Sequence, residues 1–227
     1  MARVVVLVPR RPEPWRDRLW GHVRARIEDA VEWPIHEGVD AGPQPMNRAA
    51  ARNRAAAEAG EWDVAVFCDA DTVPDFERLE EAVGRALDAK HLVCPQDTFR
   101  SLTRAGTLAV LDGCEVHEAP ERWEYPNPKS SCIVVHRDAW EAVGGYDERF
   151  VGWGFEDAAF YHACEALVGV ERLKGPCWHL WHPRSPEKDP NTRDYRRNEA
   201  LGARYKAARR DAEVMRAILA EPGGPLA

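Results

Sequence analysis

Two carboxylates stand two residues apart, directly after an apolar segment. Asp63–Cys68 is typical of a buried strand, and Asp69-Ala70-Asp71 follows it. In open α/β sheets, ligands bind beyond the carboxyl ends of the strands, where carboxylates can hold a hard divalent cation against a diphosphate. A solvated turn, with Asp75 capping the next helix, would use the same residues. The D-x-D pair therefore suggests a metal site without specifying one.

Two histidines lie three residues apart in the segment Trp178-His179-Leu180-Trp181-His182-Pro183. This spacing lets both imidazole rings reach one metal ion from a turn or a helix. A lone histidine is more commonly a packed or surface residue than a ligand. We expect a late loop at 178–182 whose histidines complete a metal site with Asp71.

The segment Val151-Gly152-Trp153-Gly154-Phe155-Glu156-Asp157 combines glycines, a tryptophan and two acids. The glycines predict a mobile loop, and both acids fall in the first turn of the helix that follows. The helix dipole and free N–H groups favour an ionised carboxylate there. Such a carboxylate suits a general base that takes a proton from a hydroxyl. Helix capping alone would explain one acid, but not the Gly-Trp-Gly ahead of it.

Strands and helices alternate through the first half of the chain, which predicts a parallel, doubly wound sheet. Apolar, β-branched runs predict strands, and apolar residues at three- and four-residue spacing predict helices. The predicted strands are Arg3–Val8, Ile35–Val39, Asp63–Cys68, Leu92–Pro95, Thr107–Leu111, Ser131–His136 and Val168–Leu173. The predicted helices are Glu13–Ala30, Met46–Ala59, Phe76–Leu87, Arg137–Val143, Phe155–Leu167 and a C-terminal helix, Asn198–Glu221.

The chain of 227 residues is long enough for one domain with a real core, and no linker or repeat divides it. We expect a single α/β domain with a mostly parallel central sheet, helices on both faces and a C-terminal helix. The net charge of −7 disfavours a nucleic-acid-binding protein. The apolar run Val4–Val8 is too short for a signal peptide or a membrane span. Six scattered cysteines without a C-x-x-C predict reduced thiols in a cytoplasmic protein.

These motifs together resemble the GT-A glycosyltransferases, and most closely the β-1,4-galactosyltransferases. Gly152–Asp157 is similar to that family's W-G-G-E-D signature, departing at Phe155, where a glycine is usual. The resemblance implies Trp153 as a mobile loop tryptophan, Glu156 as an acceptor contact and Asp157 as the catalytic base. Phe67–Pro74 is similar to the family's strand and D-x-D, which implies Asp71 as a metal ligand and Asp69 near the ribose and the metal.

The remaining family motifs follow in the expected order. His182–Asn191 resembles the metal-binding histidine segment, which makes His182 the stronger ligand, and His179 falls at a position where the galactosyltransferases use a thioether. Tyr125-Pro126 and Ser130-Ser131 lie where the family places its acceptor- and donor-facing strand. The implied nucleotide-binding residues are Pro9, Arg11, Asp40, Arg48, Asp69 and Asp71.

The resemblance implies a metal-dependent transfer of a sugar from a nucleotide sugar, by family default a UDP-hexose or UDP-N-acetylhexosamine, to an acceptor hydroxyl. The acceptor is a glycan, a protein or a small molecule. Mn²⁺ is the implied metal, with Mg²⁺ possible. Related N-acetylgalactosaminyltransferases, which retain the anomeric configuration, have asparagine at the position of Asp157, so the aspartate favours inversion. The implied halves are 1–95 for the nucleotide and 96–197 for acceptor and catalysis, followed by a helix and tail at 198–227.

Three other interpretations use the same residues. A metallohydrolase would activate water at the Asp/His site, and would need a third protein ligand. A nucleotidyltransferase would share the parallel sheet, but Pro9-Arg10-Arg11-Pro12 replaces the glycine-rich phosphate loop usual after the first strand of that class. A binding module that kept the fold without turnover is a third alternative.

Overall fold

The computed structural model describes residues 2–42, 45–185 and 187–227. Two β-sheets and eight helices are found within those residues. The strands are β1 (Val4–Arg10), β2 (Ile35–Val39), β3 (Val64–Cys68), β4 (Thr72–Pro74), β5 (Leu92–Cys94), β6 (Thr98–Leu102), β7 (Glu121–Pro126), β8 (Cys132–His136), β9 (Val170–Arg172) and β10 (Pro176–His179). The helices are α1 (Pro14–Ala30), α2 (Arg48–Glu58), α3 (Phe76–Ala89), α4 (Arg104–Leu111), α5 (Arg137–Val143), α6 (Glu156–Leu167), α7 (Arg193–Ala208) and α8 (Ala212–Leu219).

The larger sheet is mixed but mostly parallel. Its strand order is β2-β1-β3-β8-β5-β9, and β8 runs antiparallel to both of its neighbours while the other pairs are parallel. Because β1, β2 and β3 point the same way, their carboxyl ends meet at one edge of the sheet. The mostly parallel sheet confirms the predicted fold class. Pro9, Asp40 and Asp69 lie at the edge where a ligand is expected to bind.

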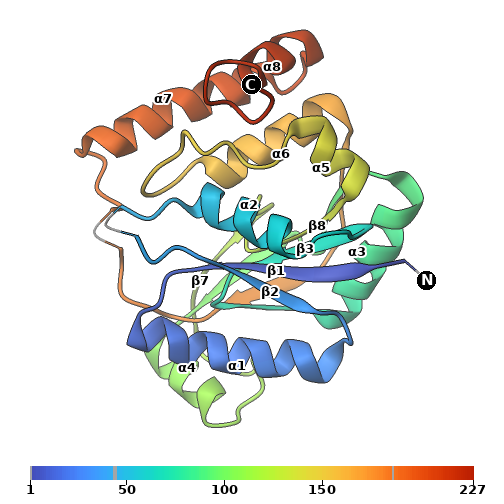
Figure 1. Cartoon of the computed structure of the whole chain (residues 1–227). Coiled ribbons are helices and arrows are strands. Elements are labelled where there is room, and N and C mark those ends of the chain that lie inside the picture. Colours follow the sequence, from blue (N-terminus) through green and yellow to red (C-terminus); the bar gives the residue numbers. More distant parts are fainter. Residues whose placement is uncertain (1, 43–44, 186) are drawn as a thin grey trace.

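Helices cover both faces of this sheet (Figure 1). Strand β3 is buried throughout, and its alternate side chains enter two different cores. Val64, Val66 and Cys68 pack with residues of α1, α3 and α4. Ala65 and Phe67 pack with residues of α2, α5, α6, α7 and α8. This two-sided burial explains why the sequence of the strand is a continuous apolar run.

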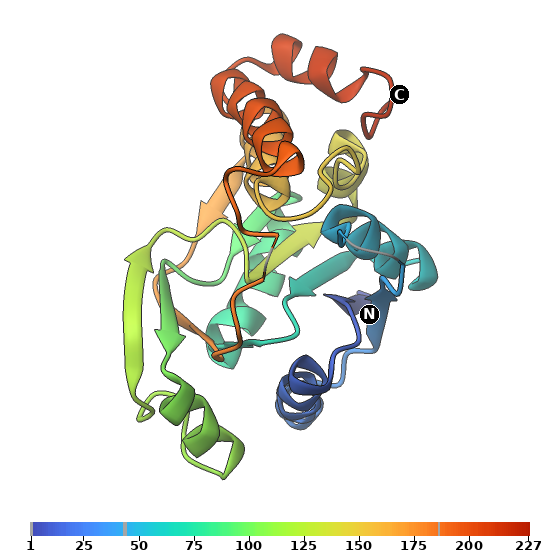
Figure 2. The ribbon, with the colours of Figure 1, turned by 90° about the vertical axis from the view of Figure 1, so that its left-hand side faces the viewer.

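A second, four-stranded sheet has the order β4-β10-β6-β7 and lies beside the first (Figure 2). The predicted strand at Thr107–Leu111 is wrong, because this segment belongs to helix α4. Thr103 caps that helix by accepting a hydrogen bond from the N–H of Gly106 at 2.9 Å. The predicted loop at 178–182 is also corrected, since Trp178 and His179 lie in β10.

The C-terminal segment forms two helices rather than the single predicted one. Helix α7 ends at Ala208, and Asp211 caps α8 by accepting bonds from the N–H groups of Glu213 and Val214. Tyr205 on α7 is buried and donates its hydroxyl to Asp147 at 2.8 Å. The described helices include none that is long and apolar enough to cross a membrane.

Strand β2 and helix α2 approach so closely that only glycine fits between them. A Cβ atom at Gly38 would lie 1.7 Å from the carbonyl oxygen of Ala51. We therefore expect Gly38→Ala to destabilise the protein by about 3 kcal/mol or more, as measured by urea unfolding. Gly21→Ala is the matched control, because no atom lies within 4 Å of its added Cβ. It should stabilise helix α1 by about 1 kcal/mol. Equal stability of the two variants would contradict the packing of α2 on β2.

Candidate active site

One carboxylate and two imidazoles meet beside the carboxyl edge of the larger sheet. Asp71 lies between β3 and β4, and the antiparallel pairing of β4 with β10 places His179 opposite Thr72. The N–H of Leu180 donates to the carbonyl of Asp71 at 2.8 Å, which fixes the loop carrying His182. Nε2 of His179 is 3.5 Å, and Nε2 of His182 3.4 Å, from the Asp71 carboxylate. Within the described chain, this is the one group of three or more His, Cys, Asp or Glu side chains whose ligand atoms all lie within 4.8 Å of one another.

The protonation of this cluster suits a cation. Burial would raise the pKa of Asp71, but His179, His182 and Arg16 outweigh it, and the pKa is lowered. Burial lowers the pKa of His182, which favours the neutral ring. Nδ1 of His182 lies 2.6 Å from the carbonyl of Pro183, so this nitrogen carries the proton and Nε2 carries a lone pair. A lone pair facing a carboxylate oxygen needs a cation between them, so the residues fit a divalent ion.

Arg16 reaches the same cluster from helix α1. Its Nη1 donates to Asp71 at 2.9 Å, and its Nη2 lies 3.2 Å from Nδ1 and 3.4 Å from Nε2 of His182. Sequence analysis missed this residue. The sequence indicates only that Arg16 falls in the first turn of the helix after β1, and this position does not specify which acid it pairs with.

Asp69 and Glu156 share a buried arginine. Arg52 on α2 is 4% exposed, and its guanidinium donates to Asp69 at 3.0 Å and to Glu156 at 3.1 Å. The same group lies 4.9 Å from the ring centroid of Tyr146. Sequence analysis missed Arg52, although Ala49, Arg52 and Ala56 share one face of α2 by their spacing. A buried arginine needs acidic partners, so its position on the buried face of α2 could have indicated that it pairs with acids of the site.

Glu156 and Asp157 begin helix α6, as the sequence predicts. Glu156 is buried, and burial together with the charge of Asp157 raises its pKa, which Arg52 opposes. Asp157 is half-buried, and its Oδ1 accepts from the N–H of Ala158 at 2.9 Å. Phe155 before them has φ = 76°, a left-handed conformation that favours glycine. The signature that this segment resembles has glycine there, so Phe155 costs backbone strain, and an edge contact with Tyr195, whose ring centroid is 5.5 Å away, helps to hold the ring.

The tryptophan loop packs against two other segments. Trp153 stacks on Tyr195 with centroids 5.8 Å apart, and Nζ of Lys188 lies 4.3 Å from its ring centroid. Arg48 donates to the carbonyl of Gly152 at 2.7 Å and pairs with Glu187 at 3.4 Å. The structure therefore brings the predicted nucleotide residue Arg48 to the loop of Trp153.

The other predicted nucleotide residues lie at the ends of β1 and β2. Pro9 pairs with Gly38 in the parallel register, and Arg11 forms an ion pair with Asp40 at 3.0 Å. The backbone N–H groups of Gly42 and Asn47 also donate to Asp40, and these bonds lower the pKa of its carboxyl against the effect of burial. Among the described residues, none accepts a hydrogen bond from the buried Nη1 of Arg11.

Three stacked aromatic rings form a ledge on β6 and β7, which we call the aromatic ledge (Phe99, Trp123 and Tyr125). Phe99 stacks on Tyr125 at 4.8 Å and on Trp123 at 5.4 Å, and lies 5.4 Å from the ring of His179. Trp123 is 46% and Tyr125 38% exposed. Burial and the charge of Asp157 raise the pKa of Tyr125, which indicates that Tyr125 lies near this acid. Because Phe99 lies beside His179, the ledge extends from solvent toward both Asp157 and the histidines.

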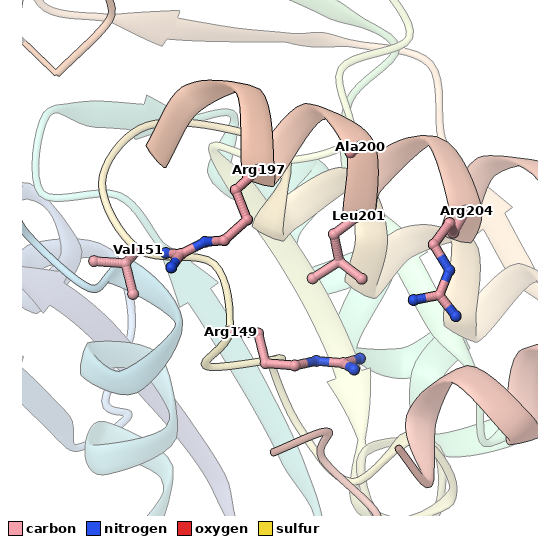
Figure 3. Close-up of a pocket in the computed structure, with 6 residues that line it drawn as sticks. All are labelled: Arg149, Val151, Arg197, Ala200, Leu201 and Arg204. Atoms are coloured by element: carbon pink, nitrogen blue, oxygen red, sulfur yellow. The ribbon is translucent and has the colours of Figure 1, made fainter. Parts of the chain in front are cut away.

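A concavity of about 530 Å³ lies elsewhere, between α7 and the turn before the tryptophan loop. Figure 3 shows its lining of Arg149, Val151, Arg197, Ala200, Leu201 and Arg204. The arginines are paired with the chain's own acids: Arg149 with Asp147 and Glu221, and Arg204 with Glu221. The ion pairs with Glu221 hold the C-terminal segment in place. None of the acids and histidines of the candidate active site lines this concavity.

Comparison with known proteins identifies the class. The family described as the N-terminal domain of galactosyltransferase matches residues 114–182, a segment that contains the aromatic ledge strand β7, the Gly-Trp-Gly-Phe-Glu-Asp motif and both histidines. No curated protein sequence matches the chain.

Several solved structures with a similar fold are glycosyltransferases. The catalytic domain of Drosophila β1,4-galactosyltransferase 7 in complex with xylobiose aligns with a TM-score of 0.58 at 15% identity, over 88% of this chain and 80% of that one. A mutant of it with manganese, UDP-Gal and xylobiose aligns at 0.57 and 16%, over 85% and 76%. Glucosyl-3-phosphoglycerate synthase from Mycobacterium tuberculosis, with Mn²⁺, UDP-glucose and phosphoglyceric acid, aligns at 0.54 and 14%, over 92% and 79%.

These comparisons confirm the resemblance that the motifs predicted. The chain has the GT-A glycosyltransferase fold, and one segment of it matches a galactosyltransferase family. The predicted enzyme class, a glycosyltransferase, agrees with both results.

Arg52 should be essential to stability, because removing it leaves the buried Glu156 and the partly buried Asp69 without a cation. We expect Arg52→Met to lower the free energy of unfolding by about 3–5 kcal/mol, measured by urea denaturation at pH 7. Arg54→Met on the exposed side of α2 is the control, and should cost about 1 kcal/mol or less. A loss at Arg52 no larger than at Arg54 would show that Asp69 and Glu156 need no compensation.

Proposed function

We propose that the chain transfers a hexose or N-acetylhexosamine from a UDP-sugar to an acceptor hydroxyl, with inversion and with Asp157 as the general base. The observation that carries the proposal is the position of Asp69. Burial is the largest influence on the pKa of Asp69 and raises it, Arg52 opposes this, and the nearby charges of Asp71 and Asp157 raise it further. The candidate metal ligand and the candidate base therefore both lie near one carboxylate, that of Asp69.

The donor would bind along the carboxyl edge of β1, β2 and β3. Arg11, whose buried Nη1 has no acceptor among the residues that the structure describes, suits a diphosphate oxygen, and Asp40 and Asp69 suit hydroxyls of the ribose. Pro9 shapes the turn, and Arg48 links the nucleotide edge to the carbonyl of Gly152. Solved structures of the same fold contain UDP-Gal and UDP-glucose, which supports a uridine nucleotide here.

Asp71, His179 and His182 would hold a divalent ion, Mn²⁺ or Mg²⁺, whose positive charge stabilises a leaving diphosphate. The donor set of one carboxylate and two imidazoles is compatible with Mn²⁺. Manganese in two of the similar structures supports that choice.

Asp157 would accept the proton of the acceptor hydroxyl as its oxygen attacks the anomeric carbon from the side opposite the diphosphate. The bond from that carbon to the phosphate oxygen breaks, and UDP leaves. Glu156, held by Arg52, orients the acceptor beside the base. The aromatic ledge offers flat apolar surfaces to the C–H face of a sugar ring, so we propose a glycoside as the acceptor. Trp153 would close over the donor and exclude water.

This assignment divides the chain by role. Residues 1–95 would bind the nucleotide, and 96–197 would supply the acceptor ledge, the base and the histidines. Residues 198–227 would brace the tryptophan loop. A cytoplasmic location, expected from the cysteines, stays a prediction.

The metallohydrolase and nucleotidyltransferase alternatives differ in what they need. A hydrolase at this cluster would turn over without a sugar nucleotide, and a nucleotidyltransferase would consume a nucleoside triphosphate. Two of the structures with a similar fold are those of a galactosyltransferase and a glucosyl-3-phosphoglycerate synthase, which favours transfer of the sugar.

A donor screen tests the function directly. With Mn²⁺ present, one of UDP-galactose, UDP-glucose or their N-acetyl forms should raise the melting temperature. At one hundred times its dissociation constant, the donor adds about 2.7 kcal/mol. Asp71→Asn should abolish the manganese-dependent part of the shift, while Asp88→Asn, an exposed change of equal charge, should keep it. Absence of any shift in the unaltered protein with all four donors would overturn the proposal.

Loss of the base should separate catalysis from binding. Asp157→Asn should lower kcat by about 10²–10⁴-fold, because proton acceptance contributes that much, while the KM for the donor changes less than about threefold. Steady-state kinetics with the donor found in the screen measures both. An equal loss of donor affinity and turnover would assign Asp157 to donor binding instead.

A further inference from the structure

Arg16 occupies the charge position of a metal ion in the Asp71–His179–His182 cluster. Its Nη1 lies 2.9 Å from Oδ2 of Asp71, and its Nη2 lies 3.2 Å from Nδ1 and 3.4 Å from Nε2 of His182. A guanidinium is always charged and only donates hydrogen bonds. It therefore binds the same carboxylate oxygen, and lies beside the same imidazole ring, that a divalent ion would take. Nε2 of His182 has a single lone pair, and a guanidinium and a divalent ion beside the same two atoms repel each other, so Arg16 and an ion compete for this position.

Arg16 also has the freedom to leave. Its side chain is 29% exposed, whereas that of Asp71 is 9% exposed. Its Nε lies 3.4 Å from the exposed carboxylate of Glu13, which offers an alternative partner. Arg16 stands in the first turn of α1, where the free N–H groups of the helix add positive potential. An anion that arrives with the ion thus meets a guanidinium fork, which matches phosphate geometry well.

We propose that Arg16 competes with the divalent ion for Asp71 and His182, and binds the diphosphate of the donor once displaced. The ion alone then binds weakly, because it must expel a cation, and the ion together with the nucleotide binds well, because the expelled cation gains a partner. Arg16 is a positioning residue that couples the two. This inference rests on the proposed function, since it takes the nucleotide diphosphate as the arriving anion.

The test measures Mn²⁺ binding to the full chain by the electron paramagnetic resonance signal of the free ion, and UDP binding by calorimetry at saturating Mn²⁺. Arg16→Gln should bind Mn²⁺ alone about fivefold to tenfold more tightly than the unaltered chain, because the competing charge is gone. It should bind UDP with Mn²⁺ about tenfold more weakly, because a charge-assisted bond is lost. The two effects have opposite signs, which a structural defect would not produce.

Two further variants complete the design. Arg18→Gln removes an equal charge from the same helix, where Arg18 is exposed and lies over Trp15, so both affinities should stay within about twofold. Arg16→Lys keeps the charge without the fork, so Mn²⁺ alone should bind as weakly as before, while UDP binding falls to an intermediate value. This lysine variant carries the test if Arg16→Gln fails to fold.

The outcomes distinguish the inference from the function on which it rests. If the unaltered chain binds no Mn²⁺ with or without UDP, the metal site of the proposed function fails. If it binds Mn²⁺ and Arg16→Gln binds the ion equally or less tightly, competition by Arg16 is overturned. Tighter Mn²⁺ binding with unchanged UDP binding would overturn the transfer of Arg16 to the diphosphate.

Discussion

Compensation of buried charge between acids and two arginines is the interaction on which the candidate active site depends. Asp69, Asp71 and Glu156 gather in a region where burial works against each carboxylate. Arg52 supplies the charge between Asp69 and Glu156, and Arg16 supplies it at Asp71. Without these guanidinium groups the acids would repel one another in a poorly solvated space, and the segments that carry them would separate.

The two arginines differ in burial, and this difference separates their roles. Arg52 has a side chain 5% exposed and bridges two motifs over the ring of Tyr146, so it is part of the permanent architecture. Arg16 has a side chain 29% exposed and contacts residues that fit a metal ion, so its contacts are exchangeable. A site that must accept a charged ligand needs both kinds of cation, because a fixed one holds the acids and a movable one makes room.

The C-terminal helices contribute to the site from behind. Tyr195 on α7 contacts both Trp153 and Phe155, and Asn198 donates to the carbonyl of Val151 at 2.8 Å. These contacts support a left-handed Phe155 where the related family has glycine. Contacts with α7 thus stabilise phenylalanine at position 155, because packing of its ring offsets the backbone strain.

Much of the fold and part of the site were predictable from the sequence. The apolar run before Asp69 and the spacing of apolar residues in α1, α3 and α6 are local signals, so the alternating strands and helices of the larger sheet followed from them. The ordered motifs at Asp69-Ala70-Asp71, Glu156-Asp157 and His179/His182 indicated the chemistry. Only the tertiary structure decided which charges balance them. Arg16 and Arg52 reach their acids across 55 and 17 residues of sequence, and the second sheet that presents His179 arises from short, partly exposed strands such as β7. Local pattern specifies elements, whereas partners across the chain are set by how those elements pack.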